Sequence, residues 1–267
     1  MILAADNLSA ARPRVARAIR ERDGAYLTGL ARRCREAGAA WLDLNPGYLP
    51  PRERAEVWRF LVATAEAAPG LTLLLDAPRP EELALALDFC NRPPVLNMAT
   101  AEPARLGPVL DLAAAHGVPV VAACMTATVP ATAAERLSLA ALLVDQADRR
   151  GIPRADVYLD PMVMPLALSG GEGHARAVVD TLRALPQLFD PPPASLTSLS
   201  NLVTRTAGAR AEFAAPPFLA ALWGAGLTVA LLDALDQPLM ATARLCRVFA
   251  GEQVFAPGEF APEGPGA

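Results

Sequence analysis

Several apolar segments of this sequence end in a single aspartate or asparagine, and these side chains are the ones that could carry chemistry. The clearest segment is LTLLLD at 71–76, where an unbroken apolar run ends in one carboxylate and a proline follows two residues later. The same arrangement recurs at Asp43 and Asn45, at Asn97, at Asp160 and at Asn201. Carboxylates accept hydrogen bonds, and carboxamides both donate and accept them. Such a set suits a flat, neutral heterocycle with several N–H donors along one edge.

The pyrimidine half of a pterin is a heterocycle of this kind. A metal site is less well supported, because no histidine and no cysteine except Cys124 lies near the ends of these segments. A polar residue after a strand can also cap a helix or start a turn. For Asp43 and Asp233 the two interpretations are equally supported. For Asp76 and Asp160, each followed by a proline within two residues, a ligand role is favoured.

The elements that must position these residues alternate between apolar runs and helical segments. Unbroken apolar runs are typical of strands buried on both faces of a parallel sheet. The 267 residues match the usual size of a TIM barrel, roughly 250 residues. We therefore predict an α/β fold, a single-domain (β/α)8 TIM barrel over residues 1–250, with a loosely ordered C-terminal tail at 251–267. The predicted strands are 1–5, 40–45, 71–76, 94–97, 118–124, 156–160, 195–200 and 227–232.

Loops are predicted in several stretches of the barrel, and two of them follow the first and the seventh predicted strands. Residues 7–23 are rich in arginine and are predicted to form a loop with one helical turn around 15–22. Residues 202–211 are predicted to form a second loop, directly after Asn201. An open dinucleotide-binding sheet is disfavoured, because no GxGxxG motif follows the first apolar segment.

Composition excludes several classes of partner and reaction. The net charge of −4, without a basic cluster, argues against nucleic acid. No apolar run approaches the ~18 residues of a membrane span, and the N-terminus does not resemble a secretory signal. The four cysteines lack a CxxC motif, so we expect no disulfide framework, no bound metal and a cytoplasmic location. All 24 basic residues are arginine, which excludes a Schiff base on lysine.

An ordered set of motifs resembles a known family. The motifs are RAIRERD (17–23), LDLNPG (42–47), LTLLLD (71–76), Asn97, YLDPMVMP (158–165) and LSNL (199–202). In this order and spacing they resemble the methyltetrahydrofolate:corrinoid/iron–sulfur protein methyltransferases, which belong to the pterin-binding barrels. The likeness runs from residue 1 to about residue 254. Each motif alone is weakly specific, whereas the ordered set is considerably more so.

The resemblance implies a fold, a reaction and a set of roles. It implies a (β/α)8 barrel that moves the N5-methyl group of methyltetrahydrofolate to the Co(I) of a corrinoid (cobalamin) carried by a partner protein. It also implies a homodimer without a metal of its own. In this family pattern the pterin ring is held by Asp76, Asn97 and Asp160, and the pocket floor is lined by Asp43 and Asn45.

Asn201 matches the catalytic asparagine of the family, which hydrogen-bonds near N5 and also contacts the pterin. Methyltetrahydrofolate is a tertiary amine and a poor leaving group, so charge must be stabilised at N5 as the methyl group departs. A hydrogen bond that strengthens in the transition state raises the rate. No nucleophilic side chain is expected, because the corrinoid supplies the nucleophile.

The sequence departs from the family pattern in places and leaves alternatives open. ADNLS at 5–9 replaces a Gly-Glu-Arg-(Ile/Thr)-Asn run, and MTA at 125–127 replaces a strand end that usually lies close to Asn or Lys. These changes motivate one alternative, a non-catalytic pterin-binding subunit of a corrinoid complex. A second alternative is dihydropteroate synthase, which is disfavoured because the chain has no lysine and no Arg-x-His after residue 201. Arg205 and Arg210 could meet the glutamate tail of folate or simply be solvated.

Overall fold

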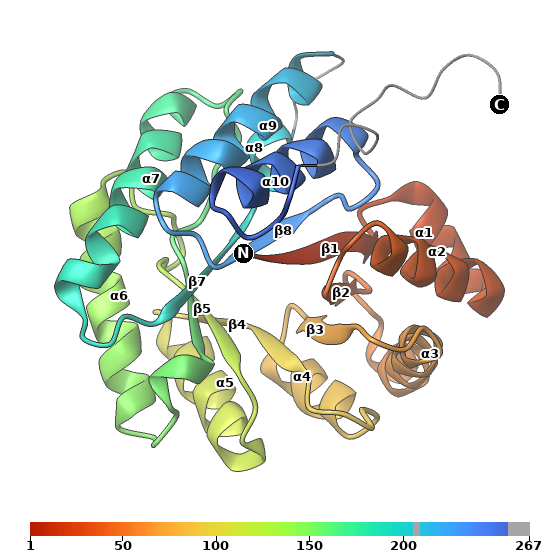
Figure 1. Ribbon diagram of the computed structural model, residues 1–267. Coiled ribbons are helices and arrows are strands. Elements are labelled where there is room, and N and C mark those ends of the chain that lie inside the picture. The colour runs from red at the N-terminus through yellow and green to blue at the C-terminus, as the bar shows by residue number, and fades with distance from the viewer. Residues whose placement is uncertain (205–208, 256–267) are drawn as a thin grey trace, which may run out of the picture.

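The computed structural model describes residues 1–204 and 209–255 of the chain. Within these ranges eight parallel strands close a barrel in sequence order, β1 to β8, and helices surround it (Figure 1). This architecture confirms the predicted (β/α)8 TIM barrel. Arg205, the side chain of Arg210 and residues 256–267 of the predicted tail lie outside the described residues. The strands are β1 Ile2–Ser9, β2 Trp41–Asn45, β3 Thr72–Asp76, β4 Val95–Thr100, β5 Val120–Ala123, β6 Val157–Asp160, β7 Ala194–Ser198 and β8 Val229–Leu232.

The helices of the described chain form the outer ring, and local sequence sets where several of them begin. Asp23 and Asp236 each accept a backbone N–H of the following helix, and Thr132 forms a capping box with Glu135. No helix in the described ranges is both long and apolar enough to cross a membrane. The helices are α1 Pro13–Glu21, α2 Gly24–Glu36, η1 Pro51–Glu53, α3 Arg54–Glu66, α4 Pro80–Leu87, α5 Pro103–His116, α6 Ala133–Asp148, η2 Arg154–Asp156, α7 Gly171–Leu188, α8 Ser200–Val203, α9 Ala209–Gly224 and α10 Gln237–Phe249.

The core has two parts, which together leave one end of the barrel polar. The larger part packs the outer faces of the strands against the helices. The smaller part fills the barrel interior, where the rings of Trp41 and Tyr158 meet edge to face at 5.1 Å between centroids. Its other buried members are Ala4, Leu74, Val95, Val121, Leu196, Val229 and Leu231. Because apolar residues from the first part of the strands fill the interior, the polar residues at the strand ends lie above them.

The prediction that residues 7–23 form a loop is wrong. Strand β1 continues to Ser9, and α1 is a full helix that buries Val15, Ala18 and Ile19 on one face. Pro13 lies in its first turn, where a missing N–H costs nothing. The buried positions follow helical spacing, but the arginines between them obscured this pattern.

Three further element boundaries differ from the prediction. Strand β4 runs past Asn97 to Thr100, and β7 ends at Ser198, so Asn201 lies on the short helix α8 and not at a strand end. Helix α9 begins at Ala209, inside the predicted loop at 202–211. The sequence SNLV after β7 satisfies its backbone with one helical turn, in which Leu202 N–H donates to the carbonyl oxygen of Leu199 at 3.0 Å.

Candidate functional site

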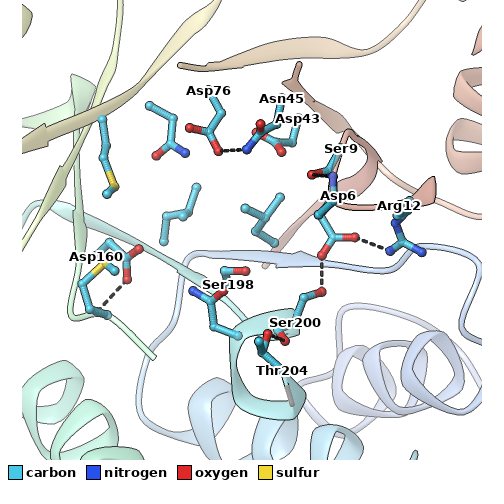
Figure 2. Close-up of a pocket in the computed structure, with 17 residues that line it drawn as sticks. Asp6, Ser9, Arg12, Asp43, Asn45, Asp76, Asp160, Ser198, Ser200 and Thr204 are labelled. Carbon is cyan, nitrogen blue, oxygen red and sulfur yellow. Dashed lines mark hydrogen bonds and ion pairs between the residues drawn. The ribbon is translucent and has the colours of Figure 1, made fainter. Parts of the chain in front are cut away.

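A cavity of about 440 Å³ lies at the C-terminal end of the barrel, and all six residues predicted from the sequence line it. Figure 2 shows Asp43, Asn45 and Asp76 grouped on one side and Asp160 on another. These side chains come from β2, β3 and β6, and their companions come from β4 and α8. The six residues are Asp43, Asn45, Asp76, Asn97, Asp160 and Asn201. Residues that are far apart in sequence therefore face one space.

Sheet register and a side-chain hydrogen bond join three of these residues. Asp76 and Asn97 are directly opposite each other in the pairing of β3 with β4. Asn45 Nδ2 donates to Asp76 Oδ2 at 2.7 Å, and Asn45 Oδ1 accepts from Gly47 N–H at 2.9 Å. With both ends of its carboxamide engaged, Asn45 has a fixed orientation and holds Asp76 in place.

Arg105, on α5, supports the same group from behind. Its guanidinium donates to the carbonyl oxygens of Met98, Pro78 and Ala77 at 2.7, 2.5 and 2.8 Å. These carbonyls follow the functional residues of β3 and β4, so one arginine joins the two strand ends. Sequence reasoning did not identify Arg105, because its contacts are to backbone atoms.

Burial shifts the titration of the acidic side chains. It raises the pKa of Asp76 to about 6, against the opposing effects of Asn45, the charge of Arg105 and Asn97. Burial likewise raises the pKa of Asp160 to about 6, although Met162 N–H donates to its Oδ1 at 2.8 Å. At neutral pH these two groups are therefore largely ionised acceptors.

Asp43 has a different environment. It is 3% exposed, and its Oδ1 is buried without a hydrogen-bond partner in the protein. Burial, followed by the charges of Asp76 and Asp6, raises its pKa well above the ordinary value. A buried polar atom at a cavity wall is available to a ligand, and a raised pKa favours the protonated form that can donate a hydrogen bond.

The lining of the cavity also includes apolar side chains that sequence reasoning missed. Leu196 and Leu231 belong to the core of the barrel interior and reach the cavity, together with Met98 and Met162. The register between β4 and β5 shifts between Asn97 and Ala99, so a bulge lets the adjacent residues Asn97 and Met98 face the same cavity. Polar groups and apolar surfaces in one cavity suit a flat ring with a polar edge.

A second missed group lies on the β1 side of the cavity. Arg12 donates from Nη2 to Asp6 Oδ1 at 2.8 Å and from Nη1 to Asp233 Oδ2 at 3.0 Å, and Ser200 Oγ donates to Asp6 Oδ2. Sequence reasoning considered Asp233, but it identified neither Asp6 as a site residue nor the arginine that joins the two aspartates. Burial raises the pKa of Asp6 although Ser200 and Arg12 oppose it. For Asp233 burial is outweighed by Asn7, the Leu235 N–H and Arg12, which lower its pKa.

Metal ligands are not gathered in this way. Across residues 1–204 and 209–255, no group of three or more His, Cys, Asp or Glu side chains is arranged to hold a metal ion. The carboxylates of the cavity are distributed around its wall and are engaged mainly by asparagines, backbone N–H groups and arginines. The arrangement therefore suits hydrogen bonding to an organic ligand.

Comparison of the sequence with known proteins finds a relative whose name states a reaction. No family model matches the chain. A methylcorrinoid:tetrahydrofolate methyltransferase of Eubacterium limosum is 28% identical over 170 residues, which are 62% of this chain and 62% of the relative. The aligned region thus spans less than two thirds of the relative's length.

Comparison of the structure finds barrels of dihydropteroate synthases. Dihydropteroate synthase from Xanthomonas albilineans in complex with 7,8-dihydropteroate superposes with a TM-score of 0.63 and 20% identity, over 86% of this chain and 85% of that one. DHPS from Yersinia pestis with a pterine-sulfa conjugate gives a TM-score of 0.70 at 13% identity, over 94% of each chain. At these identities the likeness is one of fold. Together with the relative from Eubacterium, it confirms the resemblance predicted from the sequence motifs.

Proposed function

We propose that this protein transfers a methyl group between N5 of tetrahydrofolate and the cobalt of a corrinoid carried by a partner protein. The observation that carries the proposal is the convergence of Asp76, Asn97, Asp160 and Asn201 on one cavity. The relative's name runs from methylcorrinoid to tetrahydrofolate, whereas the sequence motifs led us to expect the reverse direction. Both directions pass through the same transition state, so the same residues serve either one.

Carboxylates at the ends of β3 and β6 bind the pterin ring in this proposal. Asp76 and Asp160, with pKa values of about 6, are mostly ionised at neutral pH and accept hydrogen bonds from the amino and ring N–H groups. Asn97 both donates and accepts beside Asp76. Met98 and Met162 contact the faces of the ring. The pocket thereby selects a heterocycle with a donor-rich edge over one that presents acceptors.

Asn201 and Asp43 act at N5 in this proposal. The carboxamide of Asn201 donates to the nitrogen that loses or gains the methyl group. Asp43, whose raised pKa favours the protonated form, supplies a second donor from the buried floor. Hydrogen bonds from these donors strengthen as charge develops on N5. They therefore stabilise the transition state more than the bound substrate, which raises the rate.

The corrinoid is a substrate delivered by the partner. Its Co(I) accepts the methyl group from N5 while N5 takes up a proton from solvent, and the reverse transfer returns the methyl group to N5 and releases that proton. The cavity opens at the C-terminal end of the barrel, where catalytic residues of this fold are placed. The corrinoid protein would therefore approach that end. A homodimer and a cytoplasmic location, both predicted from the sequence, stay predictions.

The proposal is tested by following corrinoid absorbance as the purified protein is mixed with methyltetrahydrofolate and a reduced corrinoid protein. Wild-type protein should accelerate methyl transfer. Asn201→Ala should slow transfer by about 100-fold, as the loss of one preorganised donor does elsewhere, while the Kd for methyltetrahydrofolate changes by less than about threefold. Asn91→Ala, an exposed asparagine in the turn between α4 and β4, is the matched control. Equal loss of transfer and of binding in Asn201→Ala would show that the residue only binds.

Two alternatives remain distinguishable by the same preparation. Tight methyltetrahydrofolate binding without transfer to any of several corrinoid proteins would favour the non-catalytic pterin-binding subunit. Formation of dihydropteroate would favour dihydropteroate synthase, whose fold this chain shares. We rank that second alternative lowest, because the chain lacks lysine and has LVTRT at 202–206 in place of an Arg-x-His motif.

A further inference from the structure

The helical turn that carries Asn201 is too short to be stable without contacts to the rest of the protein. Helix α8 has four residues, Ser200–Val203, and Leu199 before it provides no side-chain cap. Helices much shorter than ~12 residues are marginal without tertiary contacts. The placement of Asn201 must therefore come from contacts between α8 and the barrel.

Backbone and apolar contacts fix one side of the turn. Leu199 N–H donates to the carbonyl oxygen of Leu231 on β8 at 2.8 Å, and Leu166 N–H donates to the carbonyl oxygen of Leu202 at 2.9 Å. Leu199 and Leu202 are 1% and 2% exposed. These contacts anchor the buried face of α8, but they leave the polar face, with Ser200 and Asn201, to be fixed by other groups.

Ser200 provides such a contact, since its hydroxyl donates to the carboxylate of Asp6. Asp6 is itself held at its other oxygen by Arg12, which also bridges to Asp233. The aspartate points this way by the two-residue alternation of β1, because Ile2 and Ala4 pack in the barrel interior whereas Leu3 and Ala5 pack against the helices. Figure 2 shows the carboxylate of Asp6 joined by dashed lines to Arg12 on one side and to Ser200 below it.

We propose that Asp6 is a positioning residue that sets Asn201 at the cavity through Ser200, with Arg12 fixing the orientation of the Asp6 carboxylate. The kinetic part of this inference rests on the proposed function, and the structural part does not. Asp6 also lines the cavity, so the rival role is direct contact with substrate. A positioning residue affects the transfer step, whereas a substrate contact affects binding.

The structural part is tested by hydrogen–deuterium exchange in the full-length protein. Ser200→Ala should speed exchange of the amides at 199–204 by about tenfold, the change expected when one hydrogen bond to a charged group is lost. Ser138→Ala is the matched control, because Ser138 is an exposed helical serine whose hydroxyl donates to the carbonyl oxygen of Ala134 within α6. Unchanged exchange at 199–204 in Ser200→Ala would overturn the proposal.

The kinetic part is tested with the same variants. Ser200→Ala should lower kcat by about tenfold and leave the Kd for methyltetrahydrofolate within about twofold, and Ser200→Thr should restore most of the rate because it keeps the hydroxyl. An equal fall in affinity would assign Ser200 and Asp6 to substrate binding and overturn the positioning role. If wild-type protein transfers no methyl group, the proposed function fails, while the exchange experiment still decides whether the contact between Ser200 and Asp6 fixes α8.

Discussion

The two sides of the cavity are built in different ways. On one side Asp43, Asn45 and Asp76 stand at the ends of β2 and β3, and the sheet's own pairing brings them together. On the other side Asp6 and Ser200 come from a bulged strand and a one-turn helix, and Arg12 connects them to Asp233. Backbone register places the first side, where Asn45 and Arg105 then fix the strand ends, whereas the second side depends on a network of side chains.

This difference separates two tasks. The acceptors that recognise the unchanging edge of the ring must be held in fixed positions. Strand ends hold side chains more precisely than loops do. The proposed donor to N5, Asn201, must adjust as charge develops on that nitrogen. A short helix whose position depends on a few side-chain hydrogen bonds allows such an adjustment. The comparison therefore predicts that substitutions on the strand-end side affect binding most, and that substitutions on the network side affect rate and local stability.

The largest expected effect lies on the strand-end side. Asp76→Asn keeps the shape of the side chain and an oxygen for Asn45, but it places an amide where the ring's N–H groups need an acceptor. We expect the Kd for methyltetrahydrofolate to rise by about 100-fold, because a hydrogen bond to a charged group is lost and a donor is left unpaired. Isothermal titration calorimetry measures the change. Asp88→Asn, an exposed aspartate at the end of α4, is the control.

The same substitution, Asp76→Asn, is expected to weaken binding but to increase the stability of the folded protein. Burial raises the pKa of Asp76 from 3.8 to about 6, so the folded protein binds more protons than the unfolded chain between those values. The stabilisation is complete below pH 3.8 and is lost as the pH rises to about 6. Asp76→Asn removes this loss, so its free energy of unfolding should exceed that of wild type by on the order of 3 kcal/mol at pH 7.

Urea unfolding of the apo protein at several pH values checks this difference. The wild-type curve should fall between pH 4 and pH 6 relative to the Asp76→Asn curve and run parallel to it above that range. Parallel curves throughout would mean that Asp76 does not titrate abnormally. Weaker binding combined with greater stability in one variant would show that the strand-end side is arranged for the ligand at the expense of the fold.

The strand-end side was the predictable one. Apolar runs that stop at Asp76 or at Asp160, each with a proline close behind, mark the ends of buried parallel strands by local sequence alone. In a closed parallel barrel those ends lie at one rim, so their grouping followed from the fold class. The positions of Asp43 and Asn45 at the end of β2 followed in the same way.

The network side could not be predicted, because its contacts are distant and irregular. Asn7 and Asp233 are 226 positions apart, yet Asn7 Nδ2 donates to Asp233 Oδ1 at 2.6 Å. The register of β1 against β2 shifts between Ala5 and Leu8, and Leu8 packs on the helix side, so the two-residue alternation on which strand patterns depend breaks beyond Asp6. Arg12 looked like one arginine among many in a stretch that we expected to be a loop.

The smallest predicted effect concerns the ion pairs of Arg12 with Asp6 and Asp233, which lie on the network side of the cavity. Arg12→Met leaves Asp6 and Asp233 near each other without their shared counterion. Removing one member of a partly buried ion pair destabilises the folded protein. Because the side chain of Arg12 is 37% exposed, solvent screening limits the loss in the free energy of unfolding to about 1–2 kcal/mol. Chemical denaturation measures it. Arg17→Met, which removes an exposed ion pair with Glu21 on α1, should cost less than about 0.5 kcal/mol.

The double variant Arg12→Met/Asp233→Asn distinguishes a charge network from simple packing. Neutralising Asp233 removes the repulsion that Arg12→Met exposes, so the double variant should regain a measurable part of the lost stability, about 0.5–1 kcal/mol. If the two substitutions add without coupling, the network contributes no electrostatic energy of its own. In that case the β1 side would be held by backbone packing, like the strand-end side, and the contrast between the two sides would disappear.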